Sequence, residues 1–170
     1  MPHTTIRTSY DLGPEGRILI ASLESDPAAG AEISVTVPGR AVWHVHAIRF
    51  TLVTDATVDN RIPILEIDDG QNIFASIPPP SVQTASITRP MSYYVGSERN
   101  SSFDASMMMP LPHSLIMLPG WRIRTSTVNL QAGDNYSAPV LYIRETPQRG
   151  IDAGQDALLS ALRRLIDREV

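Results

Sequence analysis

Three histidines are the residues of this chain best able to do chemistry. His44 and His46 are separated by one residue, so both imidazoles would project from the same face of a β-strand. His113 lies far along the chain and could complete a three-histidine zinc site from a second strand. The chemistry that this spacing would support is the binding of a transition metal.

A His-x-His pair on a strand of a jelly roll is also how the metal site of a cupin begins. Cupins place a glutamate four or five positions after the pair, where this chain has Phe50 and Thr51. The second cupin motif, a Pro-x-Gly followed by a histidine, is missing between Leu118 and Asn129. We therefore predict ordinary strand histidines and no metal site. A cupin-like metal-binding protein that uses the three histidines is kept as an alternative function.

No other group of residues has the spacing of an active site. The chain has no cysteine and no lysine, which removes thiolate chemistry and the lysine-containing phosphate loop. Glu66 and Asp68 share one face of a predicted strand and would suit glycoside hydrolysis or a calcium ion. However, Asp68, Asp69 and Gly70 also form the sequence of a tight turn, which we favour. We predict no enzyme, no catalytic residues and no cofactor.

Aromatic side chains offer another alternative, a carbohydrate-binding module, if several of them were exposed together. Most of them lie inside strand patterns, so core packing is the expected role. The residues concerned are Trp43, Tyr93, Tyr94, Trp121, Tyr136 and Tyr142.

The overall charge and the hydropathy pattern exclude some partners. The formal net charge is -4, so no strongly basic face for nucleic acid is expected. All 14 basic residues are arginines. The long uncharged stretch from Ala105 to Trp121 contains three prolines and cannot form a continuous membrane helix. The first residues do not resemble a secretory signal. We expect a soluble protein made without an export signal, with no nucleic acid and no membrane partner.

Short β-branched runs bounded by glycine and proline predict nine or ten strands and an all-β fold, an antiparallel β-sandwich or jelly roll. The predicted strands are Arg17–Ser22, Glu32–Val37, Ala41–Val53, Arg61–Asp68, Ile73–Ile77, Ala85–Thr88, Ser92–Val95, Leu115–Leu118, Trp121–Thr127 and Pro139–Glu145.

Three of these strands carry more detailed expectations. In Ala41–Val53 the apolar positions change parity, which predicts a β-bulge near Ala47 or burial of both faces. Arg61–Asp68 is expected to return antiparallel to that strand, with Pro63 at an edge or a bulge. The Asp-Asp-Gly turn then predicts a hairpin with Ile73–Ile77.

Two apolar segments contain prolines and are predicted as loops. Ile77–Pro80 and Met107–Leu111 would either dock a partner or fold over an open end of the sandwich.

The domain organisation follows from these patterns. We predict an N-terminal arm over residues 1–16, a β-sandwich domain over 17–146, and a linker with a C-terminal amphipathic α-helix over 147–170. The helix would bury its apolar stripe on its own sheet or on a neighbouring subunit. The stripe consists of Leu158, Leu159, Leu162, Leu165 and Ile166.

The segments Arg49–Ala75 and Leu118–Glu145 resemble a family of small structural proteins encoded among the virion genes of tailed bacteriophages. The shared features are a polar reversal ending in Asn-Arg, a strand ending in Asp-Gly, a strand opened by LPG, and a Gly-Asp-x-Tyr loop. The likeness spans roughly Ile33 to Glu145 and leaves out both terminal segments.

The resemblance implies a non-enzymatic β-sandwich within the phage particle. Its expected role is that of a trimeric cement or decoration protein that contacts the major capsid protein or other virion subunits and stabilises the head lattice. A structural role at the neck, the tail or a fibre base is the alternative location. The expected localisation is the virion, after synthesis in the cytoplasm of the host bacterium.

Overall fold

The computed structural model describes residues 4–11, 17–23, 26–99 and 106–147, and within them it is entirely β-structure. The all-β prediction is confirmed for this part of the chain. The predicted C-terminal helix lies outside the described residues. The twelve strands are β1 (Thr4–Asp11), β2 (Arg17–Leu23), β3 (Ser34–Thr36), β4 (Ala41–Val53), β5 (Ile62–Asp68), β6 (Ile73–Ile77), β7 (Thr88–Val95), β8 (Met107–Leu111), β9 (Ile116–Met117), β10 (Arg122–Val128), β11 (Asn135–Tyr136) and β12 (Val140–Pro147).

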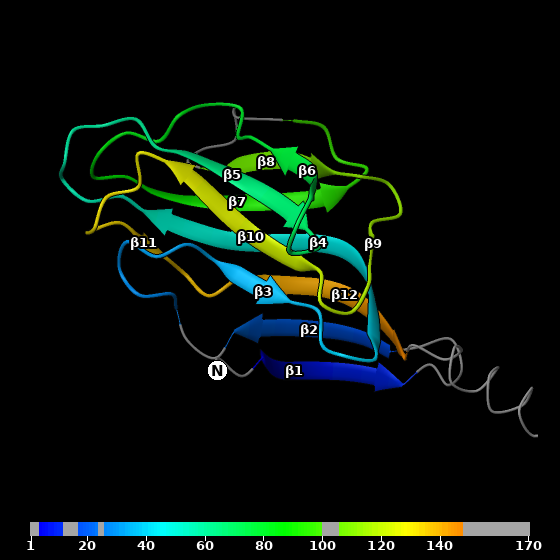
Figure 1. Cartoon of the computed structure of the whole chain (residues 1–170). Helices are drawn as coiled ribbons and strands as arrows, with labels where there is room; N and C mark the ends of the chain where they lie inside the picture. Colours follow the sequence, from blue (N-terminus) through cyan, green and yellow to red (C-terminus); the bar gives the residue numbers. More distant parts are fainter. Residues whose placement is uncertain (1–3, 12–16, 24–25, 100–105, 148–170) are drawn as a thin grey trace, which may run out of the picture.

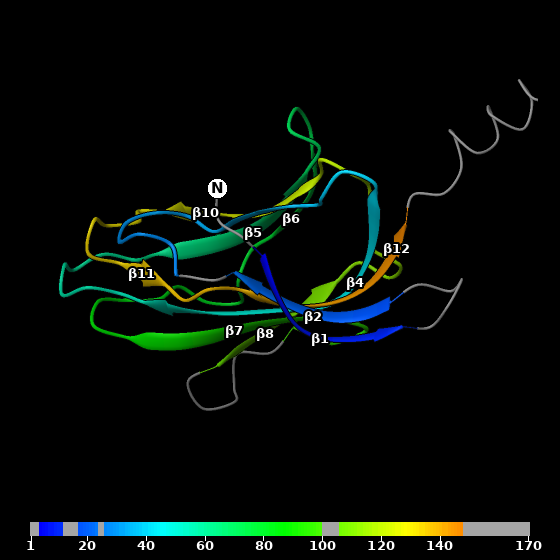
Figure 2. The ribbon, with the colours of Figure 1, turned by 90° about the horizontal axis from the view of Figure 1, so that it is seen from below.

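The strands form two sheets that lie one above the other, as in a β-sandwich (Figures 1 and 2). The larger sheet has the order β1-β2-β12-β4-β7-β8, and β9 and β11 also pair with β4. The smaller sheet has the order β3-β10-β5-β6. In Figure 1 the smaller sheet lies in front of β7, β4 and β12, whereas β1 and β2 extend the larger sheet beyond it.

One continuous apolar core fills the space between the two sheets. It forms because alternate residues of each strand point inward, and burial of these side chains is the main favourable term in folding. The core includes Val35, Leu65, Ile67 and Ile123 from the smaller sheet and Trp43, Phe50, Met91, Tyr93, Tyr136, Leu141 and Ile143 from the larger one.

Strand β4 lies at the centre of the larger sheet and contains the predicted bulge. Opposite β12, Val45 pairs with Ile143 and Ala47 pairs with Tyr142, so His46 is an extra residue with no opposite partner. The buried positions change there from odd to even numbers along the strand. The extra residue explains why the apolar pattern of this segment changes parity.

The predicted pairing of β5 with β4 is wrong. Strand β5 lies in the other sheet, between β10 and β6. Its hairpin with β6 is confirmed, with Leu65 opposite Ile77. Pro63 faces Thr127 of β10 and lies before the first residue of β5 that pairs with β6, so β5 has one neighbour at that position, although β5 is an interior strand and not an edge strand of the sheet.

Other differences concern the strands around β7. Ala85 and Ser86 form a turn, so a single strand, Thr88–Val95, replaces the two that were predicted there. Met107–Leu111 is β8, not a loop, and it pairs in parallel with β7, an exception to the antiparallel pattern. β8 ends the path of the sheet, which is the position where a strand tolerates a proline such as Pro110.

The segment predicted as an N-terminal arm contains β1. This strand pairs antiparallel with β2 along its whole length, from Thr4 opposite Leu23 to Asp11 opposite Arg17. The sequence of β1 has few apolar residues, so it gives no alternation signal, and its pairing with β2 becomes apparent only in the fold.

The other predicted loop, Ile77–Pro80, folds back onto the protein. Ile77 packs against the core, and Pro79 is buried. The segment was predicted either to dock a partner or to fold over an open end of the sandwich. For Ile77 and Pro79 the structure supports the second role.

Candidate functional site

The three histidines line one pocket of about 400 Å³. His44 and His46 come from β4, and His113 comes from the loop between β8 and β9. The rest of the lining consists of Ser114 and the apolar residues Val45, Val95, Leu115 and Ile116. The fold therefore brings together the three residues that the sequence singled out.

The bulge in β4 shapes this pocket. Trp43 and Val45 point into the core, so His44 between them points outward, and the extra residue His46 is exposed as well. Bulges often redirect a side chain in this way. On either side of His44 lie Ile116 of β9 and Arg144 of β12, its two cross-strand partners.

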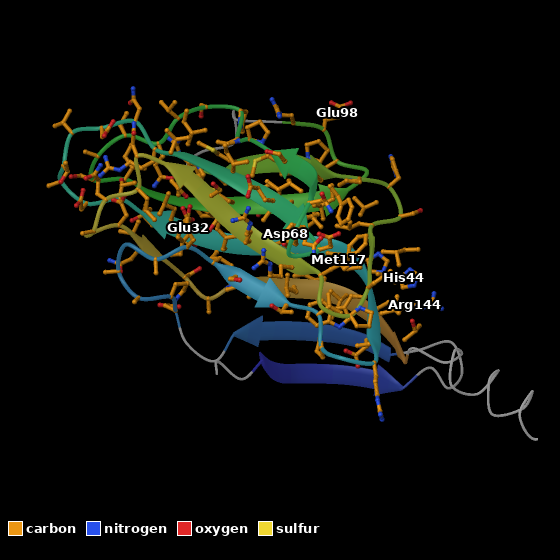
Figure 3. All side chains as sticks on the ribbon, in the orientation of Figure 1. Glu32, His44, Asp68, Glu98, Met117 and Arg144 are labelled. Atoms are coloured by element: carbon orange, nitrogen blue, oxygen red, sulfur yellow. The ribbon has the colours of Figure 1, made fainter. Side chains whose placement is uncertain are left out.

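The positive charges around the pocket affect one another. The pKa of His44 is lowered, first by burial, then by the charge of Arg144 and by His46. Figure 3 shows His44 and Arg144 together at the same end of the molecule. Among the described residues, no three histidine or carboxylate side chains form a group with the geometry of a metal site.

A second polar cluster lies inside the protein at Arg61, whose side chain is 0% exposed. Its guanidinium donates to both carboxylate oxygens of Asp134, at 3.0 and 3.1 Å, and to Asp55 Oδ1 at 2.6 Å. It also donates to the backbone carbonyl groups of Thr57 and Asp59. The guanidinium thus connects the segment after β4 to the loop between β10 and β11.

The carboxylate of Asp134 is equally well held. Burial by itself opposes its charge, but hydrogen bonds from Arg61 and from the backbone amides of Gln131 and Asp55 outweigh that effect and lower its pKa. Hydrogen bonding to Asp134 in turn raises the pKa of Arg61. A buried ion pair with all these partners is structural in character, because its charges are already compensated.

Arg61 and Asp134 are residues of two of the four motifs on which the resemblance rests. Arg61 ends the polar reversal, and Asp134 belongs to the Gly-Asp-x-Tyr loop. Tyr136 of the same loop is buried, and its hydroxyl lies 2.5 Å from Thr127 Oγ1. The sequence shows both motifs but does not predict their contact. The only sign of that contact in the sequence is that one turn contains an arginine and another, distant turn contains an aspartate.

The carboxylates Glu66 and Asp68 lie on the outer face of the smaller sheet, opposite two arginines of β10. Arg124 contacts Glu66 at 2.7 Å and Asp68 at 2.8 Å, and Arg122 contacts Asp68 at 2.7 Å. Asp68 Oδ1 also accepts the amide of Gly70, which agrees with the predicted turn. Figure 3 labels Asp68 on this sheet. The ion pairs with these two arginines were not predicted from the sequence, although the arginines alternate along β10 as the carboxylates do along β5.

Half of the aromatic side chains named from the sequence are in the core. Trp43, Tyr93 and Tyr136 are buried, as predicted, whereas Tyr94, Trp121 and Tyr142 are half-buried. Phe74 of β6 is 52% exposed and stacks on Trp121 with 4.4 Å between the ring centroids. One face of each of these two rings packs against the other ring, so Phe74 and Trp121 form an apolar corner and not an open platform.

Comparison with known proteins adds no relative. No family model matches the sequence, and no curated protein matches it significantly. The part of the chain that the structure describes contains no helix long and apolar enough to cross a membrane.

Proposed function

We propose that this chain is a structural virion protein of a tailed bacteriophage. Its role in this proposal is that of a capsid cement or decoration protein, a homotrimer that binds the major capsid protein and stabilises the head lattice. The two layered sheets would be a jelly-roll variant completed by the C-terminal helix. The protein would function in the virion and would not be an enzyme.

One observation carries this proposal. The polar residues of the two phage-like segments meet in a buried tie between Arg61 and Asp134, so these segments share residues that build a fold and not residues that react. A resemblance based on fold-building residues supports a common architecture. It therefore favours a structural role over catalysis.

Quantitative mass spectrometry of purified phage particles tests the proposed location. A cement protein should be present in a copy number similar to that of the major capsid protein, because it occupies repeated lattice positions. A few copies per particle would instead place the chain at the neck, the tail or a fibre base. Absence from purified particles would contradict the whole proposal. Light scattering on the isolated full-length chain tests the trimer separately.

A further inference from the structure

The face of the larger sheet that points away from the smaller one carries two tyrosines around β4. After the bulge, the even-numbered residues of β4 belong to the core, so the odd-numbered residues point to this opposite face. Ala47 is one of them, and its partners on the two neighbouring strands are Tyr142 of β12 and Tyr94 of β7. Because neighbouring strands lie about 5 Å apart, the backbones of the two tyrosines flank Ala47 at a separation of roughly 10 Å.

Both tyrosines lie outside the core. Neither of them belongs to the apolar cluster between the sheets, and nor does Ala47, although Ala47 is only 5% exposed. The two rings opposite Ala47 account for its burial, while each tyrosine itself stays half-buried. In Figure 2 no described strand lies beyond the larger sheet on this side. Within the part of the chain that the structure describes, the rings of Tyr94 and Tyr142 are therefore accessible to a ligand.

A hollow of about 300 Å³ lies beside Tyr142. Arg49 and Thr51, the next outward residues of β4, line it together with Ser137 and with Pro90, which lies opposite Thr51. Arg49 is two residues from the β4 partner of Tyr142, a diagonal position that long side chains can reach. The hollow is at the lower end of the size range of ligand pockets, roughly 300–1,000 Å³. Its size suits a single small ring.

The polar groups of the hollow are held in place by the fold, and two of them have no partner of their own. Ser137 fixes the backbone, because its hydroxyl accepts the amide of Thr51 and its own amide donates to the carbonyl of Thr51, both at 2.9 Å. Among the described residues, the Thr51 hydroxyl and the Arg49 guanidinium make no hydrogen bond or ion pair. Asp26 accepts the amide of the lining residue Ala138 at 2.6 Å and does not pair with Arg49.

We propose that this face binds a saccharide, with one pyranose ring seated in the hollow against Tyr142 and the next sugar unit directed across Ala47 toward Tyr94. The C–H groups on one side of a pyranose pack on an aromatic ring, and its hydroxyl groups need both donors and acceptors. The hydroxyls of Thr51 and Tyr142 supply both, and the guanidinium of Arg49 supplies donors. This site goes beyond the proposed place in a virion and does not depend on it.

The composition of the same face argues against a protein as the occupant. A specific protein interface buries about 800 Å² on each partner and has an apolar centre. Among the described residues, only one of the exposed large apolar side chains, Val53, belongs to β4, β7 or β12. The residues between Val53 and the tyrosines on β4 are the polar Thr51 and Arg49. A ligand rich in hydroxyl groups matches this mixture better than a second copy of the chain does.

An array of oligosaccharides of glucose, galactose, mannose, N-acetylglucosamine and galacturonic acid, probed with the full-length chain, tests the proposal. We expect saturable binding of at least one of these sugars, measured afterwards by calorimetry. In NMR titrations with that sugar, the ring signals of Tyr94 and Tyr142 should shift, whereas those of the buried Tyr93 and Tyr136 should not.

Three variants and one matched control connect the binding to this face. Tyr142→Ala removes the ring and should weaken binding about tenfold, whereas Tyr142→Phe keeps the ring and should weaken it by only a few-fold. Arg49→Gln changes an exposed side chain and should also weaken binding. The control is Phe74→Ala, which removes an exposed ring from the smaller sheet and should leave binding unchanged.

Three results would overturn the proposal. The first is silence of the whole array. The second is sugar binding that neither Tyr142→Ala nor Arg49→Gln weakens, because the ligand would then occupy another surface. The third is a change of oligomeric state in Tyr142→Ala, seen by light scattering with sugar binding unchanged, which would make this face a contact between copies of the chain. Circular dichroism of each variant checks that it folds.

Discussion

Arg61 shows how a single residue can hold two distant segments of this protein together. Its guanidinium and the Asp134 carboxylate are both 0% exposed, so neither charge is stabilised by water. Breaking such a pair is costly because the remaining partner stays buried without compensation. Arg61 therefore has a structural role.

Replacement of Arg61 by leucine should strongly destabilise the protein. The expected loss is about 3–5 kcal/mol in the free energy of unfolding, because Asp134 would be left as an uncompensated buried charge. Urea unfolding of the full-length chain measures the change. The matched control is Arg99→Gln, which removes an exposed arginine and should change stability by less than about 0.5 kcal/mol. Equal stabilities for the two variants would show that the tie between Arg61 and Asp134 is not structural.

At the scale of elements, β8 is one of the strands that the sequence pattern did not predict. Its composition, three methionines and a proline, has neither β-branched residues nor a polar alternation. In the structure Met107, Met109 and Leu111 are buried, while Met108 and Pro110 between them are half-buried on the other face. The alternation exists in burial but not in polarity, so it becomes visible only when the strand is paired.

The two methionines Met109 and Met108 provide a direct test of this strand. Met109→Ala should lower the free energy of unfolding by about 2–5 kcal/mol, because it leaves a cavity in the core. Met108→Ala removes the same atoms from the other face and should cost less than about 1 kcal/mol. Chemical denaturation measures both changes. Similar losses at the two positions would contradict the burial pattern and favour the loop that the sequence predicts.

Among the residues whose burial the structure describes, one apolar core is shared by the two sheets. Nearly all buried apolar side chains of both sheets belong to this cluster, so neither sheet can bury its apolar face without the other. A domain of this kind is expected to unfold in one cooperative transition. The two tryptophans lie conveniently on different sheets: Trp43 is in β4 of the larger sheet, and Trp121 directly precedes β10 of the smaller one.

Single-tryptophan variants test this cooperativity. In Trp43→Phe the remaining fluorescence reports on the smaller sheet, and in Trp121→Phe it reports on the larger one. Within each variant, fluorescence and far-ultraviolet circular dichroism should give the same midpoint of urea unfolding. A midpoint for Trp121 fluorescence clearly below that of circular dichroism would mean that the smaller sheet separates first. That result would contradict a single shared core.

The sequence by itself determined most of the strand segments, the change of buried face along β4 and the hairpin between β5 and β6. Each of these depends on local alternation or on turn residues such as Asp68, Asp69 and Gly70, and such signals are contained in a few consecutive positions. The placement of His44 and His46 on one side of their strand followed from the same two-residue period. These features could be predicted because their physical causes are local.

Only the tertiary structure decided which strands are neighbours and which distant residues meet. Alternation specifies a buried face but not the partner strand, so the placement of β5 in the smaller sheet and the parallel pairing of β8 could not be predicted from it. The contact between Arg61 and Asp134 joins residues that lie 73 positions apart. The approach of His113 to His44 and His46 likewise depends on how the loop after β8 returns to β4. These are long-range contacts, and the packing of the whole chain determines them.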